Sequence, residues 1–252
     1  MRGLYHMQVL SIGNSFSCDA HRYLRRIAEA GGAQLTVVNL YIGGCSLERH
    51  YRNMLSGSRE YGLEINGFST GFKVSLQEAL LNRRWDVVTL QQASHFSPYY
   101  ESYQPYINKL AEYIRTCLPK AKVLIHQTWA YEQGSARLCK ELGYTDQKQM
   151  YDQIVQAYDR AAEDICADGI IPSGTLFQKL LAGGAETVHR DTFHASLGLG
   201  RYALGLLWYA VLTGRDVCGN PFADFDEPVS PEHIALAQRC VSELAAEQAS
   251  KR

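Results

Sequence analysis

Three polar residues, from two distant parts of the sequence, have the types and spacing for nucleophilic catalysis. Ser15 follows Gly13-Asn14 directly after a short apolar run, and Asp191 precedes His194 by three residues. A serine hydroxyl becomes a nucleophile when a histidine takes its proton, and a carboxylate can orient that histidine and stabilise the imidazolium. The spacing Asp-x-x-His lets the carboxylate fold back onto the ring. These residue types would suit a triad in which Ser15 attacks, His194 acts as base and Asp191 orients it.

Each of these motifs also has a purely structural interpretation. Asn14, Ser15 or Ser17 could simply cap a helix that begins near Ala20, because short polar side chains are favoured there. Asp191 could likewise cap a helical turn while His194 packs against its neighbours. The tripeptide alone favours the cap, and Asp-x-x-His alone is common by chance.

Two further segments could stabilise the oxyanion of an acyl-transfer reaction. Gly43-Gly44 follows a second predicted strand, and a glycine lets a backbone N–H approach a reacting carbonyl closely. Gln91 and Gln92 follow a third, and a side-chain amide can donate as well. We predict an oxyanion hole formed by the N–H groups of Ser15 and Gly44 with a third donor from one of the two glutamines. The alternative is an ordinary turn and surface amides.

Aromatic residues after the predicted strand ends suggest a binding surface for sugar rings. Trp129, Tyr131 and His95 are the candidates, and ordinary packing in the core or at its rim is the alternative. His189 and His194 could also be imagined as metal ligands. No third ligand follows at a useful spacing, so we expect neither a metal ion nor a cofactor.

Strand patterns alternate with helical patterns, which is typical of an α/β domain with a mostly parallel sheet and helices on both faces. In such sheets the active crevice lies beyond the carboxyl ends of the strands. We predict one domain over residues 1–252 with a hairpin insertion near 60–75, around Asn66-Gly67. The predicted strands are Val9 to Ile12, Gln34 to Ile42, Asp86 to Leu90, Lys122 to His126 and Gly169 to Pro172. The predicted helices are Ala20 to Ala30, Leu47 to Leu55, Leu76 to Asn82, Tyr106 to Cys117, Gln149 to Cys166, Leu199 to Leu212 and Pro231 to Gln248.

Composition excludes several classes of protein. The 252 residues include 25 Lys and Arg against 26 Asp and Glu, so the net charge of -1 gives no basic stripe for a nucleic acid. No apolar run approaches the ~20 residues of a membrane helix, so we expect no membrane association. Seven widely spaced cysteines without a Cys-x-x-Cys pair favour a reducing cytoplasm, and an exported mature form stays open.

Taken together, these motifs resemble the SGNH or GDSL hydrolases, and specifically a little-characterised SGNH-like branch of unknown function common in gut bacteria. The phrases Ile12-Gly13-Asn14-Ser15-Phe16 and Leu90-Gln91-Gln92 carry this resemblance. It implies a flavodoxin-like three-layer α/β/α sandwich with a five-stranded sheet. The chain departs from the family at two points. Asn14 stands where Asp is usual, and Leu90-Gln91-Gln92-Ala93-Ser94 replaces Gly-x-Asn-Asp.

The resemblance implies a serine hydrolase of esters, and we expect a carbohydrate O-acetylesterase acting on a small-molecule or oligosaccharide ester. One alternative is a catalytically inactive carbohydrate-binding protein, because the Asn-Asp block is replaced. Another is a thioesterase or lipid esterase, which would need an apolar cleft or lid. The polar, mixed stretch from Glu132 to Gln149 does not favour such a lid. The acyl group, the sugar and the oligomeric state stay open.

Overall fold

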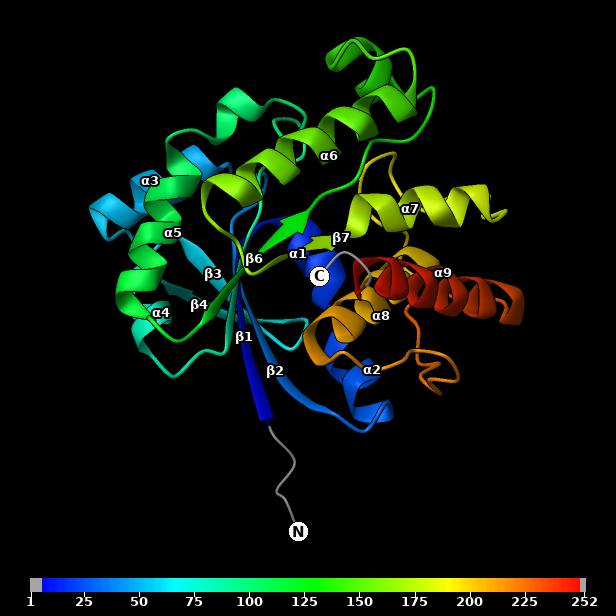
Figure 1. Ribbon diagram of the computed structural model, residues 1–252, viewed down its shortest axis with the longest axis horizontal. Helices are drawn as coiled ribbons and strands as arrows, with labels where there is room; N and C mark the ends of the chain where they lie inside the picture. Colours follow the sequence, from blue (N-terminus) through cyan, green and yellow to red (C-terminus); the bar gives the residue numbers. More distant parts are fainter. Residues whose placement is uncertain (1–5, 250–252) are drawn as a thin grey trace.

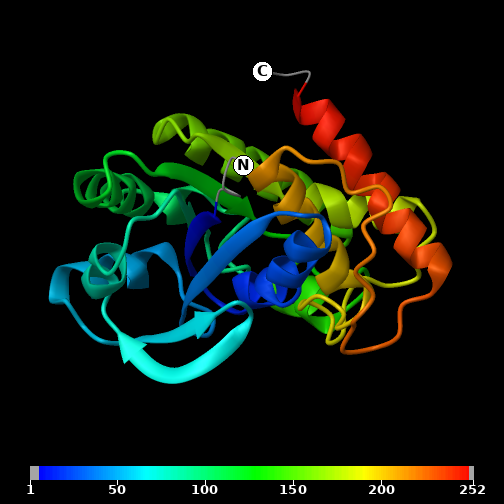
Figure 2. The ribbon, with the colours of Figure 1, turned by 90° about the horizontal axis from the view of Figure 1, so that it is seen from below.

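A seven-stranded sheet runs through the protein, with helices on both of its faces (Figures 1 and 2). The computed structural model describes residues 6–249, and the strand order in this part is β4-β3-β2-β1-β5-β6-β7. The strands are β1 His6–Gly13, β2 Gln34–Tyr41, β3 Tyr61–Ile65, β4 Phe68–Val74, β5 Val87–Leu90, β6 Lys122–Gln127 and β7 Gly169–Pro172. The sandwich expected from the resemblance is confirmed.

The number of strands is the part of the fold prediction that is wrong. Five strands, from β2 through β7 in the sheet order, are parallel. β3 and β4 pair with each other and with β2 in antiparallel fashion, so they extend the sheet at one edge. The turn of this hairpin carries Asn66 and Gly67, both with positive φ. A hairpin predicted as an insertion is thus part of the sheet itself.

The helices form two layers around the sheet. Helices α1, α2, α7, α8 and α9 pack together on one face, and α3, α4, α5 and α6 cover the other (Figures 1 and 2). The helices are α1 Ser15–His21, α2 Leu24–Ala30, α3 Leu47–Ser56, α4 Leu76–Leu81, α5 Tyr106–Cys117, α6 Gln147–Asp164, α7 Ser173–Ala182, α8 Leu199–Thr213 and α9 Pro231–Ala249, with a 3-10 turn at Tyr100–Tyr103 and a π-helical turn at Arg137–Glu141.

Helix α8 forms the centre of its layer. It is apolar nearly all round and almost entirely buried, as expected for a helix enclosed on every side. It contacts α1, α2, α7, α9 and β7. Because α8 contacts α1, the segment just before α8 is brought close to α1.

Helix α1 begins at Ser15 because Asn14 caps it. Asn14 Oδ1 accepts the N–H of Phe16 at 3.0 Å, and Ser17 Oγ accepts the N–H of Asn14 at 3.1 Å, which together form a capping box. The predicted helix from Ala20 to Ala30 therefore starts earlier and is split into α1 and α2. Ser15 consequently lies in the first turn of a helix, directly beyond the end of β1.

Gly13 leaves no room for a side chain at this junction. A Cβ there would lie 2.2 Å from Ser17 Oγ and 3.2 Å from Gln91 Oε1. We expect Gly13→Ala to lower the free energy of unfolding by about 1–3 kcal/mol through overpacking. Urea denaturation measures this. Gly62→Ala is the control, because the nearest atom to its Cβ would lie at 3.5 Å. Equal effects of the two substitutions would contradict the prediction.

Candidate active site

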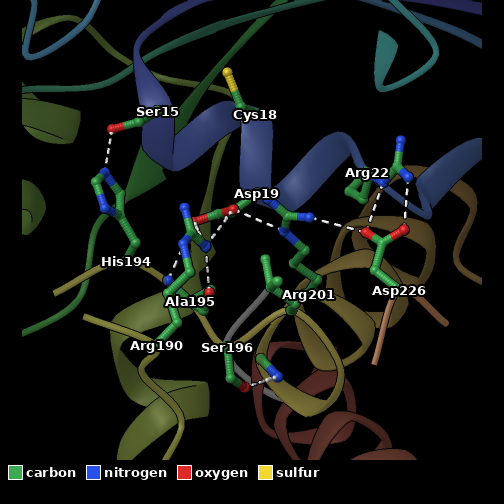
Figure 3. A network of polar contacts seen from close by, with 12 residues as sticks. Ser15, Cys18, Asp19, Arg22, Arg190, His194, Ala195, Ser196, Arg201 and Asp226 are labelled. Carbon is green, nitrogen blue, oxygen red and sulfur yellow. Dashed lines mark hydrogen bonds and ion pairs between the residues drawn. The ribbon is translucent and has the colours of Figure 1, made fainter. Parts of the chain in front are cut away.

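The structure brings Ser15, His194 and Asp191 together in one hydrogen-bonded line. Asp191 can only accept, so His194 Nδ1 carries the proton that it donates to Asp191 Oδ2 at 2.8 Å. The other ring nitrogen, Nε2, then accepts from Ser15 Oγ, also at 2.8 Å (Figure 3). The backbone N–H of His194 donates to the second carboxylate oxygen at 2.9 Å. This arrangement is suited to nucleophilic catalysis by a serine.

The environment of Asp191 keeps its carboxyl ionised. Partial burial acts to raise the pKa of Asp191, but hydrogen bonds from the side chain and backbone of His194 outweigh it, and the pKa is lowered below its ordinary value. Nearly half of the side chain, 46%, stays exposed to solvent. The carboxylate is therefore available as an orienting anion at neutral pH.

The turn between Asp191 and His194 is strained, and hydrogen bonds from another segment of the chain hold it in place. Thr192 has φ +74°, a conformation that is rare for a β-branched residue. Its carbonyl accepts the N–H of Glu132 at 2.7 Å. The carbonyl of Phe193 accepts the indole N–H of Trp129, also at 2.7 Å. Both donors lie just beyond the end of β6, so this strand end fixes the turn.

Trp129 is therefore a support for the turn, and its prediction as a sugar-binding residue is wrong. Its side chain is fully buried and its ring stacks on Phe16, with 4.1 Å between centroids. The indole also packs against the ring of Phe177, with 4.7 Å between centroids. No ring face is left for a ligand.

A buried carboxylate ties the same loop to helix α1. Asp19 lies one helical turn after Ser15, and its side chain is 1% exposed. It accepts hydrogen bonds from Arg190 Nη1 at 2.9 and 3.0 Å, from Arg201 Nε at 2.8 Å and from the N–H of Ala195 at 3.1 Å (Figure 3). Four hydrogen bonds thus join α1 to both ends of the Arg190–Ala195 segment and to α8.

The backbone N–H groups of Ser15 and Gly44 have no hydrogen-bond partner in the described part of the chain, and both residues line one cavity. Gly44 has φ +59°, a conformation that favours glycine. Asn14 fixes this turn by donating from Nδ2 to the carbonyl of Cys45 at 3.2 Å. The two N–H groups are therefore free to bind an oxyanion.

The prediction that Gln91 or Gln92 supplies a third oxyanion donor is wrong, because neither side chain reaches the cavity. Both are buried. Gln92 Oε1 accepts the N–H of Leu47 at 2.9 Å, and its Nε2 donates to Ser102. Gln91 Nε2 donates to Asn14 Oδ1 at 2.7 Å, so this glutamine supports the cap of α1 instead.

Gln91 belongs to a chain of buried side chains beneath the cavity. Its Oε1 accepts from Nδ1 of His126 at 2.7 Å, and Nε2 of that ring accepts from Ser173 Oγ at 3.0 Å. Burial lowers the pKa of His126 to about 3, so the ring stays neutral at physiological pH. The chain holds the amide of Asn14 in one orientation.

The cavity in front of Ser15 and His194 measures about 550 Å³. Tyr131 and His95 line it, and their role in binding a substrate stays a prediction. Ser94, which the sequence analysis did not predict as a site residue, also lines the cavity, and its hydroxyl is hydrogen-bonded to the hydroxyl of Tyr131 at 2.9 Å. The remaining lining residues are Asn14, Phe16, Tyr41, Gly43, Gly44, Arg137, Glu141, Leu142 and Phe193.

Arg137 is the cationic residue that sequence analysis missed in this lining. Its guanidinium lies 4.0 Å from the centroid of the Phe193 ring, and Glu141 is 4.0 Å away. The ring of Phe193 in turn packs on His194, with 3.8 Å between centroids. No motif marks Arg137 in the sequence, because the π-helical turn that carries it is recognisable only in the structure.

Within residues 6–249, no group of three or more His, Cys, Asp and Glu side chains is arranged to hold a metal ion. His189 is buried, and its Nε2 lies 3.1 Å from the carbonyl oxygen of Ala130. None of the helices in the same range is long and apolar enough to cross a membrane.

This architecture is the SGNH hydrolase fold. A candidate SGNH hydrolase from Slackia heliotrinireducens is 25% identical, with a TM-score of 0.61 over 82% of this chain and 100% of its own. An acetylxylan esterase, Axe2 from Geobacillus stearothermophilus, shares the fold with a TM-score of 0.55 at 14% identity, over 84% of this chain and 97% of its own. The resemblance expected from the sequence is confirmed at the level of the fold.

The chain belongs to the DUF4886 family, described as a domain of unknown function, which it matches over residues 8–244. A crystal structure of a DUF4886 family protein from Bacteroides uniformis is 34% identical, with a TM-score of 0.89, and covers 97% of this chain and 96% of its own. No curated protein matches the chain.

Asn14 needs an amide because it donates as well as accepts. In Asn14→Asp an oxygen would face the carbonyl of Cys45 where Nδ2 now donates at 3.2 Å. We expect the Gly44 turn to shift and kcat for hydrolysis to fall about tenfold or more, since a small displacement of groups around a reacting atom is costly. Steady-state kinetics measures this. Asn108→Asp is the matched control, because Asn108 only accepts, from Gln104 on the surface. Unchanged kcat in Asn14→Asp would contradict the prediction.

Asp226 provides a stability prediction that depends on pH. Hydrogen bonds from Arg22 lower its pKa to about 2, against an unfolded value of about 3.9. The ionised group therefore stabilises the fold above about pH 4, and this contribution is lost as the pH falls from about 4 to 2. We expect the difference in Tm between the protein and Asp226→Asn to be largest at neutral pH and to shrink toward pH 2. A difference that is constant with pH would contradict this.

Proposed function

We propose that this protein is a serine ester hydrolase that removes acetyl groups from carbohydrates. The observation that carries the proposal is the continuous line of hydrogen bonds from Asp191 through His194 to Ser15, with 2.8 Å at each step. The line ends at a cavity, and Ser15 lies in the first turn of a helix, where developing negative charge is favoured.

In the proposed reaction, Ser15 Oγ attacks the acyl carbon while its proton passes to His194 Nε2. Asp191 stabilises the resulting imidazolium. The oxyanion accepts hydrogen bonds from the N–H groups of Ser15 and Gly44. As the intermediate collapses, the C–O bond to the alcohol breaks and His194 returns the proton to the leaving oxygen. Water then attacks the acyl-serine by the same route, which releases the acid and restores the hydroxyl.

The lining of the cavity supports a polar leaving group. Hydroxyls of Ser94 and Tyr131, the Arg137–Glu141 pair and the ring of His95 offer hydrogen bonds and a ring edge. Sugars carry many hydroxyls and bind where polar groups and aromatic rings lie together. The acetylxylan esterase that shares the fold is consistent with this substrate class. A long acyl chain would instead need a continuous apolar cleft.

A catalytically inactive carbohydrate-binding protein is the main alternative. A site that had lost its function would have no reason to retain a strained turn at Thr192 or free N–H groups at Ser15 and Gly44. The geometry therefore favours an enzyme.

Loss of the nucleophile tests the proposal directly. We expect Ser15→Ala to lower kcat on p-nitrophenyl acetate and on acetylated xylo-oligosaccharides by about 10⁴-fold or more, as in other triads. A fluorophosphonate probe should label the protein at Ser15 and should not label His194→Ala, because only an activated serine reacts quickly.

Ser69→Ala is the control, since Ser69 is exposed on the β4 strand. It should retain full activity and labelling. Full activity in Ser15→Ala would refute the mechanism. A folded protein that neither hydrolyses these esters nor reacts with the probe would favour the inactive alternative.

A further inference from the structure

Arg190 stands between two carboxylates that have different tasks. Its Nη1 donates to both oxygens of Asp19, at 2.9 and 3.0 Å, and to the carbonyl of Ala195. Its Nε lies 4.0 Å from Oδ2 of Asp191, the same oxygen that accepts from His194. The guanidinium is thus hydrogen-bonded to Asp19, whereas it forms only a long ion pair with Asp191, outside hydrogen-bonding distance.

The choice between these carboxylates matters for the triad. Arginine forms strong paired hydrogen bonds with carboxylates. If Arg190 bound Asp191, it would compete with His194 for Oδ2 and neutralise the charge that stabilises the imidazolium. The histidine would then be oriented less well, and its proton would be held less favourably during the reaction.

The surroundings of Asp19 explain why Arg190 stays where it is. Asp19 is almost fully buried and cannot turn toward water. Arg201 Nε and the N–H of Ala195 fix it from two further directions (Figure 3). A buried carboxylate that lost a cation would be left poorly compensated, so Arg190 is bound to it strongly.

We propose that Asp19 is a positioning residue that holds Arg190 outside hydrogen-bonding distance of Asp191, so that Asp191 keeps its hydrogen bonds with His194. This inference rests on the proposed triad. Asp19 does not touch the cavity, since it lies one turn of α1 beyond Ser15. Asp19 therefore acts indirectly: it binds Arg190, and Arg190 lies near the carboxylate of Asp191 that binds His194.

Steady-state kinetics of a single variant and of a double variant test the proposal. In Asp19→Asn the charge that holds Arg190 is gone, and we expect kcat to fall about tenfold or more with KM little changed. Adding Arg190→Gln removes the competitor, so the double variant should recover at least about threefold in kcat over Asp19→Asn. If Asp19 were only a structural tether, the second substitution would remove one more contact and recover nothing. No recovery, or an unchanged kcat in Asp19→Asn, overturns the proposal.

Asp226→Asn is the matched control. Asp226 is the outer carboxylate of the same network, and it binds Arg22 and Arg201 without touching Arg190 or the Asp191–His194 turn (Figure 3). It undergoes the same chemical change as Asp19, and its kcat should stay at that of the unmodified protein. A loss equal to that of Asp19→Asn would overturn the proposal, because it would show a general effect of weakening the network.

Two measurements keep the inference separable from folding and from the proposed function. A crystal structure of Asp19→Asn should show Arg190 hydrogen-bonded to Asp191, whether or not any ester is a substrate. A guanidinium that stays in place overturns the proposal. If Asp19→Asn does not fold, kcat of the single variant Arg190→Gln tests the proposal instead. Its kcat should stay within about threefold, and a loss above about tenfold would show that Arg190 is itself required.

Discussion

The buried carboxylate of Asp19 is the constraint on which the geometry of the site depends. A carboxylate in the interior is tolerated only when charged and N–H partners surround it, and breaking such a buried pair costs about 3–5 kcal/mol. Its partners here come from the loop that carries His194 and from α8. Since Asp19 and Ser15 lie one turn apart on α1, satisfying the carboxylate also places the histidine beside the serine. A requirement of folding thereby brings together two residues that are distant in the sequence.

A second polar system fixes the turn that precedes Ser15. This system consists of one side chain from the carboxyl end of each of four strands that are successive neighbours in the sheet. The strands are β1, β5, β6 and β7, and the side chains are those of Asn14, Gln91, His126 and Ser173. Each side chain bonds the next, so the chain runs along the carboxyl edge of the sheet below the cavity. Because burial keeps His126 neutral, the donor and acceptor order along the chain does not change in the physiological pH range. The Gly-x-Asn-Asp block of other SGNH hydrolases is thus replaced by residues that orient Asn14 from below.

The sequence predicts those parts of the molecule that depend on local pattern. Strand and helix order follow from periodicity. The short spacing predicts that Asp191 meets His194, and the resemblance to the SGNH hydrolases predicts that Ser15, at the end of a strand, joins them. The roles of Gln91, Gln92 and Trp129 were predicted wrongly for one physical reason. A polar group after a buried strand can face the crevice or satisfy the interior, and only its tertiary partners decide. Helix α7 went unpredicted because Pro172, Ser173 and Gly174 resemble a turn. Gly174 is required there for a tertiary reason, since a Cβ on it would lie 2.5 Å from the carbonyl oxygen of Thr128.

The imidazole of His194 is held by contacts that do not need a substrate. Asp191 binds one nitrogen, while the rings of Phe193 and Phe16 lie 3.8 and 5.9 Å from the imidazole centroid and limit its rotation. The turn that presents it contains the strained Thr192, which costs about 1–3 kcal/mol. Hydrogen bonds from Glu132 and Trp129 to the carbonyls of Thr192 and Phe193 offset this strain. Trp129, expected from the sequence to bind a sugar ring, is therefore better understood as one of the groups that hold the turn presenting His194, because its indole N–H binds the carbonyl of Phe193 in that turn.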